Sequence, residues 1–171
     1  MGNRQKKYMR ETRTVKTSYV FPPDTNHLGT LFGGKLMAYI DDTASIAAAK
    51  LARCTVVTAS TDSVDFIAPI RVGNVVTVEA IVTWTGRTSM EVFVKVSAED
   101  LKTEETSIAA ISFLTFVALD ENGKPTPVPE VVPETDEERW LNETAKQRAE
   151  QRLLRKKQSE EMARYFSNAM L

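Results

Sequence analysis

The chain has 171 residues, of which 42% are hydrophobic and 26% are charged, and its formal net charge is −1 at pH 7. This composition is typical of one globular domain with a sizeable core, and the near-zero charge gives no whole-chain electrostatic case for nucleic-acid binding. The single cysteine, Cys54, excludes an internal disulfide, and no apolar run reaches the roughly 18 residues that a membrane-spanning helix needs.

The first seven residues are basic but contain no apolar stretch of the kind that signal peptides carry. A lone cysteine fits a reducing compartment, where thiols stay unpaired. We therefore expect a soluble cytoplasmic protein that does not insert into membranes.

The first predicted elements are a short strand and a long helix. Residues 12–20 form the strand, and Pro22-Pro23 ends it. After a loop and the pair Gly33-Gly34, the sequence becomes apolar at helical spacing as far as about Ala52. The apolar face of this helix is Leu36, Met37, Ile40, Ala44, Ala47, Ala48 and Leu51. Because alanines also occupy its other sides, we expect a central helix that is largely covered.

Four further strands are predicted after the helix, at residues 55–66, 75–84, 89–99 and 106–119. The second and third alternate in polarity and are joined by a hairpin connection at residues 85–88. The fourth is apolar on both faces, as a strand covered on both sides is. One helix against about five antiparallel strands is an α+β arrangement.

The last quarter of the chain has a different composition. Four prolines between residues 125 and 133 predict an extended linker, and Thr135 precedes a long charged helix that reaches about Phe166. Its apolar stripe is thin, so we expect the helix to pack on its own sheet or on another subunit. We therefore divide the chain into a domain at residues 1–128 and a linker with a charged helix at 129–171.

An acid pair, Asp41-Asp42, lies within the apolar helix. Carboxylates are rarely buried without a partner, so this position indicates a function, and catalysis is the first hypothesis. The two side chains point about 100° apart around the helix and cannot occupy one position. The structural alternatives are an ion pair between Asp41 and a buried lysine or arginine, and a solvated or interface charge at Asp42.

Several short motifs follow the order strand, proline loop, glycine pair, long helix and four strands. They are Pro23-Asp24-Thr25-Asn26, Gly29, Phe32-Gly33-Gly34, Leu36-Met37, Asp41, Ala44, Val57-Thr58, Phe66-Ile67-Ala68-Pro69-Ile70, Gly73-Asn74 and Gly86-Arg87-Thr88-Ser89. Together they resemble the acyl-CoA thioesterases of the hotdog superfamily in bacteria and animals. The resemblance covers roughly residues 12–128 and implies the hotdog fold, in which an antiparallel sheet wraps one central helix.

The resemblance implies that the chain hydrolyses acyl-CoA to a free acid and CoA, with Asn26 and Asp41 as a catalytic pair in a site shared by two subunits. Asp41 would activate water as a general base or attack the thioester carbonyl itself, and the sequence leaves both courses open. Asn26 would hold the water or the carbonyl oxygen, although asparagine is also a common turn residue. No metal and no cofactor besides the CoA of the substrate are expected.

The residues themselves agree with this chemistry. Gly33 and Gly34 present backbone N–H groups at a helix start, where negative charge such as a developing oxyanion is favoured. Asp41 lies eight residues beyond Gly33, hence roughly 12 Å along the helix, so one copy cannot bring both groups to one carbonyl. We therefore expect a homodimer as the minimum unit. The resemblance favours a hexamer of three dimers, between which the charged terminal helix is a candidate to wrap.

Six further residues are expected to bind substrate: Thr58, Ser60, Arg71, Arg87, Thr88 and Ser89. The arginines would bind the phosphates of CoA, although arginines at strand ends often serve solubility alone. Thr58 and Ser60 lie on an unusually polar strand, one face of which would line the site or a polar dimer seam. His27, the only histidine, lies in a loop and is expected to be exposed.

Two other functions fit the same motifs. A hotdog hydratase or dehydratase would need a histidine paired with an acid, for which His27 is poorly placed. A CoA- or nucleotide-binding sensor would keep the groove without the chemistry. The sequence contains neither a cluster with metal-ligand spacing nor a GxSxG nucleophile motif.

Overall fold

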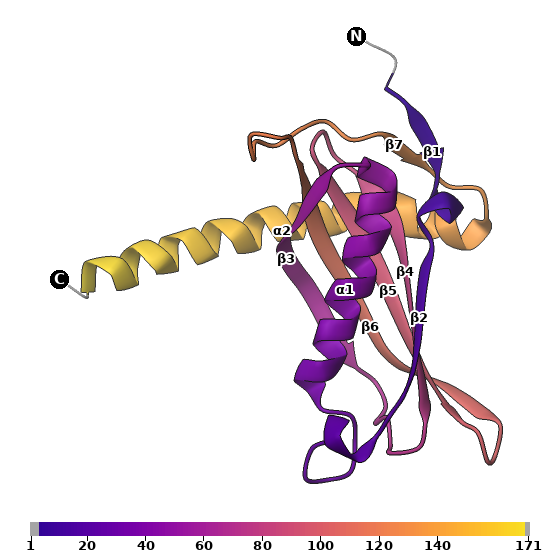
Figure 1. Ribbon diagram of the computed structural model, residues 1–171. Helices are drawn as coiled ribbons and strands as arrows, with labels where there is room; N and C mark the ends of the chain where they lie inside the picture. The colour runs from indigo at the N-terminus through magenta and orange to yellow at the C-terminus, as the bar shows by residue number, and fades with distance from the viewer. Residues whose placement is uncertain (1–3, 170–171) are drawn as a thin grey trace.

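A five-stranded antiparallel sheet with one long helix across one face forms the centre of the computed structural model, which describes residues 4–169 (Figure 1). The strands are β2 (Thr14–Tyr19), β3 (Thr55–Phe66), β4 (Val75–Thr85), β5 (Ser89–Asp100) and β6 (Glu105–Leu119). Their order across the sheet is β2-β4-β5-β6-β3. This arrangement confirms the expected α+β class and the hotdog fold.

The helix α1 (Gly33–Ala52) begins at the glycine pair and ends where Arg53 adopts a left-handed conformation at φ 56°. One side of α1 is buried against the sheet through Leu36, Ile40, Ala44, Ala47, Ala48 and Leu51. The three alanines allow a close approach to the alternating valines of β4 and β5. The predicted helix from about 33 to 52 is therefore correct at both ends.

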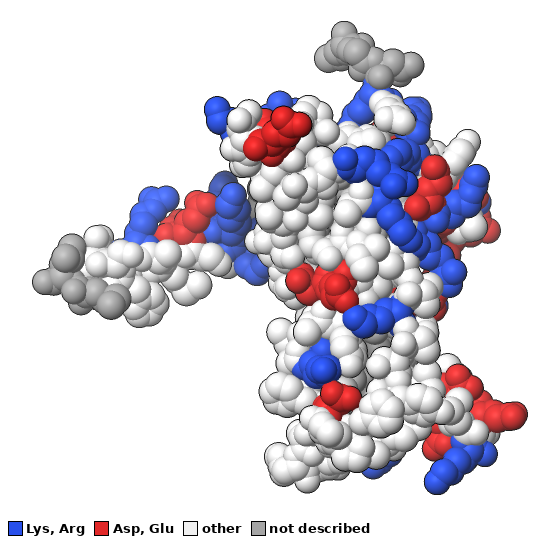
Figure 2. Space-filling model, in the orientation of Figure 1, with Lys and Arg blue, Asp and Glu red and all other residues white. Residues whose placement is uncertain are grey.

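The opposite side of α1 is not covered. Met37 and Ile46 are 47% and 44% exposed, and both Asp41 and Asp42 are exposed. The expectation of a helix largely covered on all sides is therefore not met within one chain, because the sheet reaches only one side of it. Figure 2 shows this face of the molecule as a broad area with few charges.

The proline-rich segment returns to the amino terminus. Its strand β7 (Glu130–Val132) pairs in parallel with β1 (Lys6–Tyr8), and Val128 and Val131 are buried in the core. The sequence did not predict this pairing, because two three-residue strands carry no readable periodicity. The segment is thus not a free linker, and the division at residue 128 stays a prediction.

The terminal helix α2 (Asp136–Ala169) crosses the sheet on the face opposite α1 and then projects past the edge formed by β3 (Figure 1). Its first half packs on the sheet through Leu141 and Ala145, which are buried. Within residues 4–169, no helix has both the length and the apolar character needed to cross a membrane.

The edge strand β3 pairs with β6 on one side, and its other side carries no strand within the described chain. Its first seven residues, 55–61, carry no charge, so little discourages another strand from adding here. Its register with β6 shifts twice, between Thr58 and Ser60 and between Thr61 and Ser63. These irregularities decide which side chains of β3 face α1.

Candidate active site

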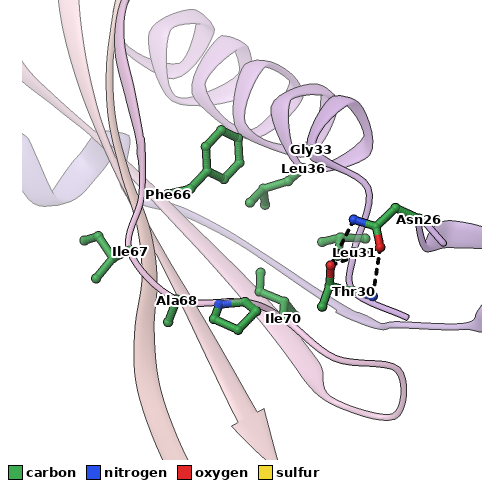
Figure 3. Close-up of a pocket in the computed structure, with 10 residues that line it drawn as sticks. Asn26, Thr30, Leu31, Gly33, Leu36, Phe66, Ile67, Ala68 and Ile70 are labelled. Carbon is green, nitrogen blue, oxygen red and sulfur yellow. Dashed lines mark hydrogen bonds between the residues drawn. The ribbon is translucent and has the colours of Figure 1, made fainter. Parts of the chain in front are cut away.

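A pocket of about 380 Å³ opens at the amino-terminal end of α1 (Figure 3). Its polar side is formed by Asn26, Thr30 and the backbone of Gly33. The rest of the lining is apolar and comprises Leu31, Leu36, Phe66, Ile67, Ala68, Pro69 and Ile70. A polar rim around an apolar floor suits a ligand with one polar group and a hydrocarbon part.

Asn26 both shapes the loop and faces the pocket. Its Oδ1 accepts hydrogen bonds from the backbone N–H groups of Leu28 at 2.9 Å and Thr30 at 3.3 Å, and its Nδ2 donates to the Thr30 hydroxyl at 2.9 Å. Because an amide nitrogen carries two hydrogens, one N–H of Asn26 remains for a ligand. The turn role and the catalytic role are therefore compatible.

The glycine pair leaves its amides open at the helix start. No side chain caps α1, and within residues 4–169 neither Gly33 nor Gly34 donates its N–H to an acceptor. A Cβ on Gly34 would lie 2.6 Å from the ring of Phe32, and one on Gly33 would lie 3.6 Å from the ring of Phe66. Small residues therefore keep this end of α1 accessible, and its dipole favours an oxyanion there.

Asp41 faces the edge strand. Its Oδ1 accepts a hydrogen bond of 2.8 Å from the hydroxyl of Thr58 on β3. Asp42 points elsewhere and forms an ion pair of 2.6 Å with Lys16 on β2. The two acids thus point in different directions, as the helix geometry predicts, and Asp42 has a cationic partner on the surface. Asp41 is exposed and forms no ion pair within residues 4–169, so its pairing with a buried lysine or arginine is not found in the single chain.

One chain does not bring Asn26 and Asp41 to the same place. The pocket that contains Asn26 and Gly33 is not lined by Asp41, which lies roughly 12 Å further along α1. Each copy therefore carries the two groups of candidate residues at different positions along the same helix, both beside the open side of β3.

The two β3 residues expected to bind substrate face opposite sides of the sheet. Thr58 faces α1, whereas Ser60 donates a hydrogen bond to Asp62 and lines a groove beneath α2. The expectation that they share one face is wrong, because the register shift between them breaks the alternation on which it rested.

The other candidate binding residues lie at both ends of β4. Arg71 is exposed beside the Asn26 loop, where its backbone bridges to Thr30. Arg87, Thr88 and Ser89 follow the opposite end of the strand, and Arg87 is exposed. Eleven residues of strand separate the two groups, roughly 35 Å, so one chain does not unite them.

An ionic cluster between α2 and the sheet was missed by sequence reasoning. Glu91 on β5 is fully buried and accepts hydrogen bonds from Arg148 at 2.9 Å and Thr83 at 2.8 Å. Asp62 on β3 pairs with Arg152 at 3.0 Å and with Arg155 at 2.5 Å. The available signal was the spacing of the three arginines, which places them on one side of a helix.

His27 is exposed in its loop, and no group of histidine, cysteine and acidic residues within the described chain is arranged to hold a metal ion. The candidate reactive groups are the carboxylate of Asp41, the amide of Asn26 and the free N–H groups of the glycine pair.

Comparison with known proteins shows which family the chain belongs to. Residues 28–105 match the Thioesterase superfamily. The chain is 58% identical over 163 residues to the uncharacterized acyl-CoA thioester hydrolase YkhA of Bacillus subtilis (strain 168), and the match covers 95% of each chain. The chain belongs to the thioesterase superfamily. It is thus a thioester hydrolase by family, as the resemblance implied.

Solved structures agree with the thioesterase fold. The acyl-CoA hydrolase of Staphylococcus aureus, in complex with butyryl-CoA, CoA and CoA disulfide, has a TM-score of 0.91 and 48% identity, with 95% of this chain and 99% of that chain covered. A hexameric acyl-CoA thioesterase has a TM-score of 0.87 and 54% identity, with 88% and 97% covered. Structures of three variants of the Staphylococcus aureus enzyme are also similar to this chain. In these variants, alanine replaces an asparagine, an aspartate or a threonine.

Proposed function

We propose that this thioesterase hydrolyses acyl-CoA to a free acid and CoA, with Asp41 of one copy acting on a thioester held by Asn26 and the Gly33-Gly34 amides of a second copy. The observation that carries the proposal is the placement of both half-sites beside the open side of β3. The complex of the similar Staphylococcus aureus acyl-CoA hydrolase with butyryl-CoA supports the substrate class.

The spacing of three polar residues supports the choice of Asn26, Asp41 and Thr58. In the Staphylococcus aureus hydrolase, the asparagine, aspartate and threonine that were replaced by alanine follow one another at intervals of 15 and 17 residues. The same residue types stand at the same intervals in this chain. The aspartate and threonine of the set are the pair joined by the hydrogen bond at the sheet edge.

Two copies can complete the site by pairing their β3 strands in an antiparallel manner. Such pairing turns one copy end over end, so that the amino-terminal end of one α1 approaches the middle of the other. The same pairing places opposite ends of the two sheets next to each other. Arg71 of one copy therefore lies at the end where the partner has Arg87. The homo-oligomer proposed here agrees with the hexameric assembly of the relative described above.

In the proposed reaction, the thioester oxygen accepts hydrogen bonds from the Gly33 and Gly34 amides, and the apolar pocket holds the acyl chain. Water attacks the carbonyl carbon while the Asp41 carboxylate takes its proton, and Asn26 orients the water or the carbonyl. The C–S bond then breaks, and the sulfur leaves with the electron pair and receives a proton. Direct attack by Asp41 is the alternative course, through an anhydride that water then cleaves.

Arg71 and Arg87 are proposed to bind the phosphates of CoA. Thr88 and Ser89 are proposed to make polar contacts with CoA. Thr58 is proposed to act beside the reacting atoms, through Asp41. Ser60 faces the groove under α2 and is the weakest of the candidates. The route uses only side chains and amides, so we propose that it needs neither metal nor organic cofactor besides the CoA of the substrate.

The test is thiol release from a panel of acyl-CoA esters by three proteins: wild type, Asp41→Asn and Asp42→Asn. We expect kcat to fall by about 10²–10⁴-fold in Asp41→Asn, the range of a lost general base, and to change little in the neighbouring variant. An Asp41→Asn enzyme at near wild-type rate would refute the role of Asp41. Binding of CoA without thiol release from any ester would favour a sensor.

A further inference from the structure

The last part of α2 projects from the molecule without a partner in its own chain. The last ion pairs between α2 and the sheet are those of Arg152 and Arg155 with Asp62. The helix continues past the edge of the sheet (Figure 1). It has fourteen further residues to Ala169, roughly 21 Å, and every described side chain after Arg155 is exposed. Most helical stability in proteins comes from tertiary packing, so a contact with another surface would stabilise this part of the helix.

An apolar stripe begins at Leu154, next to the last ion pair, and continues along the projecting part. Leu154, Met162 and Tyr165 are 62%, 56% and 71% exposed, and their spacing places them within one sector of the helix. Figure 2 shows uncharged atoms along one side of this projection. Buried Leu141 and Ala145 mark the side of α2 that faces its own sheet, and the stripe is turned from that side by roughly a third of a turn. It therefore faces sideways, where a neighbouring helix would lie, and not towards a sheet.

The charges of the same segment are arranged for antiparallel self-association. A basic block at residues 155–157 is followed by an acidic block at residues 160–161. Two such helices in antiparallel orientation, centred on Gln158, place the basic block of each beside the acidic block of the other. The same register sets Leu154 opposite Met162. A parallel pair would instead oppose like charges, which is unfavourable.

The position of α2 on its own sheet suits this partner. Its arginines hold Asp62, which lies about one and a half residues from the middle of β3. If the two-fold axis of a β3–β3 pair passes through the middle of the strand, each α2 lies roughly 5 Å from the axis along the strand direction. The two helices would then be roughly 10 Å apart, which is the distance between packed helices.

We propose that the projecting part of α2 binds the α2 helix of a second copy, side by side and antiparallel, with Gln158 at the two-fold axis. This interface lies on the face of the sheet opposite α1 and therefore opposite the proposed catalytic groups. The inference rests on the β3 edge pairing of the proposed function. The ionic cluster around Asp62 and Glu91 sets the direction in which α2 leaves the sheet.

Oxidative cross-linking tests the register directly. In the full chain with Cys54→Ser, a Gln158→Cys substitution places a cysteine at the axis, where it meets its copy. A Ser167→Cys substitution, nine residues on, faces the opposite side of the helix and serves as the matched control. We expect a covalent dimer from the first variant under mild oxidation and none from the second.

Light scattering on the same samples distinguishes a failure of the α2 pairing from a failure of the β3 edge pairing. A dimer or larger species without a Gln158→Cys cross-link overturns the α2 pairing and leaves the edge pairing and the activity intact. A monomeric wild type overturns the edge pairing as well.

A charge-matched pair of variants tests the apolar stripe. Leu154→Glu with Met162→Glu places four carboxylates in the interface, and we expect about a tenfold or greater weakening of the subunit affinity. Arg164→Gln with Ser167→Glu changes the net charge by the same amount on another side of the helix, outside both charged blocks, and is expected to leave the affinity unchanged. Equal affinities in both double variants would overturn the stripe as the contact.

Discussion

Thr58 on the edge strand β3 donates a 2.8 Å hydrogen bond to the carboxylate of Asp41 on α1. The bond links the uncovered side of the helix to the uncovered edge of the sheet. It holds the carboxylate in one orientation at the place where a second copy would approach. In the proposed reaction, Thr58 is a positioning residue whose hydroxyl acts on the chemistry through Asp41.

Replacing Thr58 by valine removes the hydroxyl and keeps the shape of the side chain. A hydrogen bond to a charged group contributes about 1.5–3 kcal/mol, so we expect kcat to fall by about 10–100-fold while KM changes little. Steady-state kinetics with one acyl-CoA provide the measurement. Thr58→Ser, which restores the hydroxyl, should recover most of the rate, and a failure of this rescue would contradict the positioning role.

A site shared between copies predicts complementation of two inactive variants. Asn26→Ala and Asp41→Ala homodimers should each be inactive, since every site lacks one group. After mixing, unfolding and refolding together, half of the dimers are mixed, and each has one complete site. We therefore expect recovery of about a quarter of the wild-type activity for a two-fold shared site. A mixture that stays inactive would show that both residues act within one chain.

The buried ion pair between Glu91 and Arg148 predicts a large loss of stability when one partner is removed. Arg148→Met leaves the Glu91 carboxylate in the interior with the Thr83 hydroxyl and the more distant Arg152, which lies 3.8 Å away. Breaking a buried pair costs about 3–5 kcal/mol, and we expect the lower end because Arg152 remains. Urea unfolding gives the value, with exposed Lys146→Met as the control on the same helix.

A double variant separates loss of packing from the unpaired charge. If Glu91→Gln combined with Arg148→Met is as unstable as Arg148→Met alone, the uncompensated carboxylate is not the cause.

Glu79 on β4 predicts a pH dependence of stability. Burial by itself raises the pKa of this carboxyl, but Arg13 and Lys95 outweigh burial and lower the pKa from its ordinary value of 4.5. Because the folded-state pKa lies below the unfolded one, the stabilisation is fully present above about pH 4.5 and disappears as the pH falls through the folded-state value.

The matched measurement is urea unfolding of wild type and Glu79→Gln at several pH values. We expect the wild type to be more stable at pH 7 and the two proteins to converge in strong acid. A constant difference across the whole range would contradict an electrostatic origin and indicate a loss of packing.

Local patterns in the sequence were sufficient for the main elements. The Gly33-Gly34 pair and the apolar spacing after it defined α1, and period-two alternation defined β4 and β5, because both signals depend only on near neighbours. The different directions of Asp41 and Asp42 also followed from helix geometry alone, whereas the preference for Asp41 came from the family resemblance. The distance between Asp41 and the glycine pair followed from the same geometry, and it agreed with the two-subunit site that the family resemblance implied.

Tertiary structure decided what depends on distant contacts. The pairing of β1 with β7 joins segments more than 120 residues apart, and no local pattern records it. A register shift in β3 turned Ser60 away from Thr58, because the conformation of an edge strand follows its partner β6. The burial of Glu91 beside Arg148 needed α2 to cross the sheet at one position. The open side of α1 became visible only when the sheet proved to cover one face.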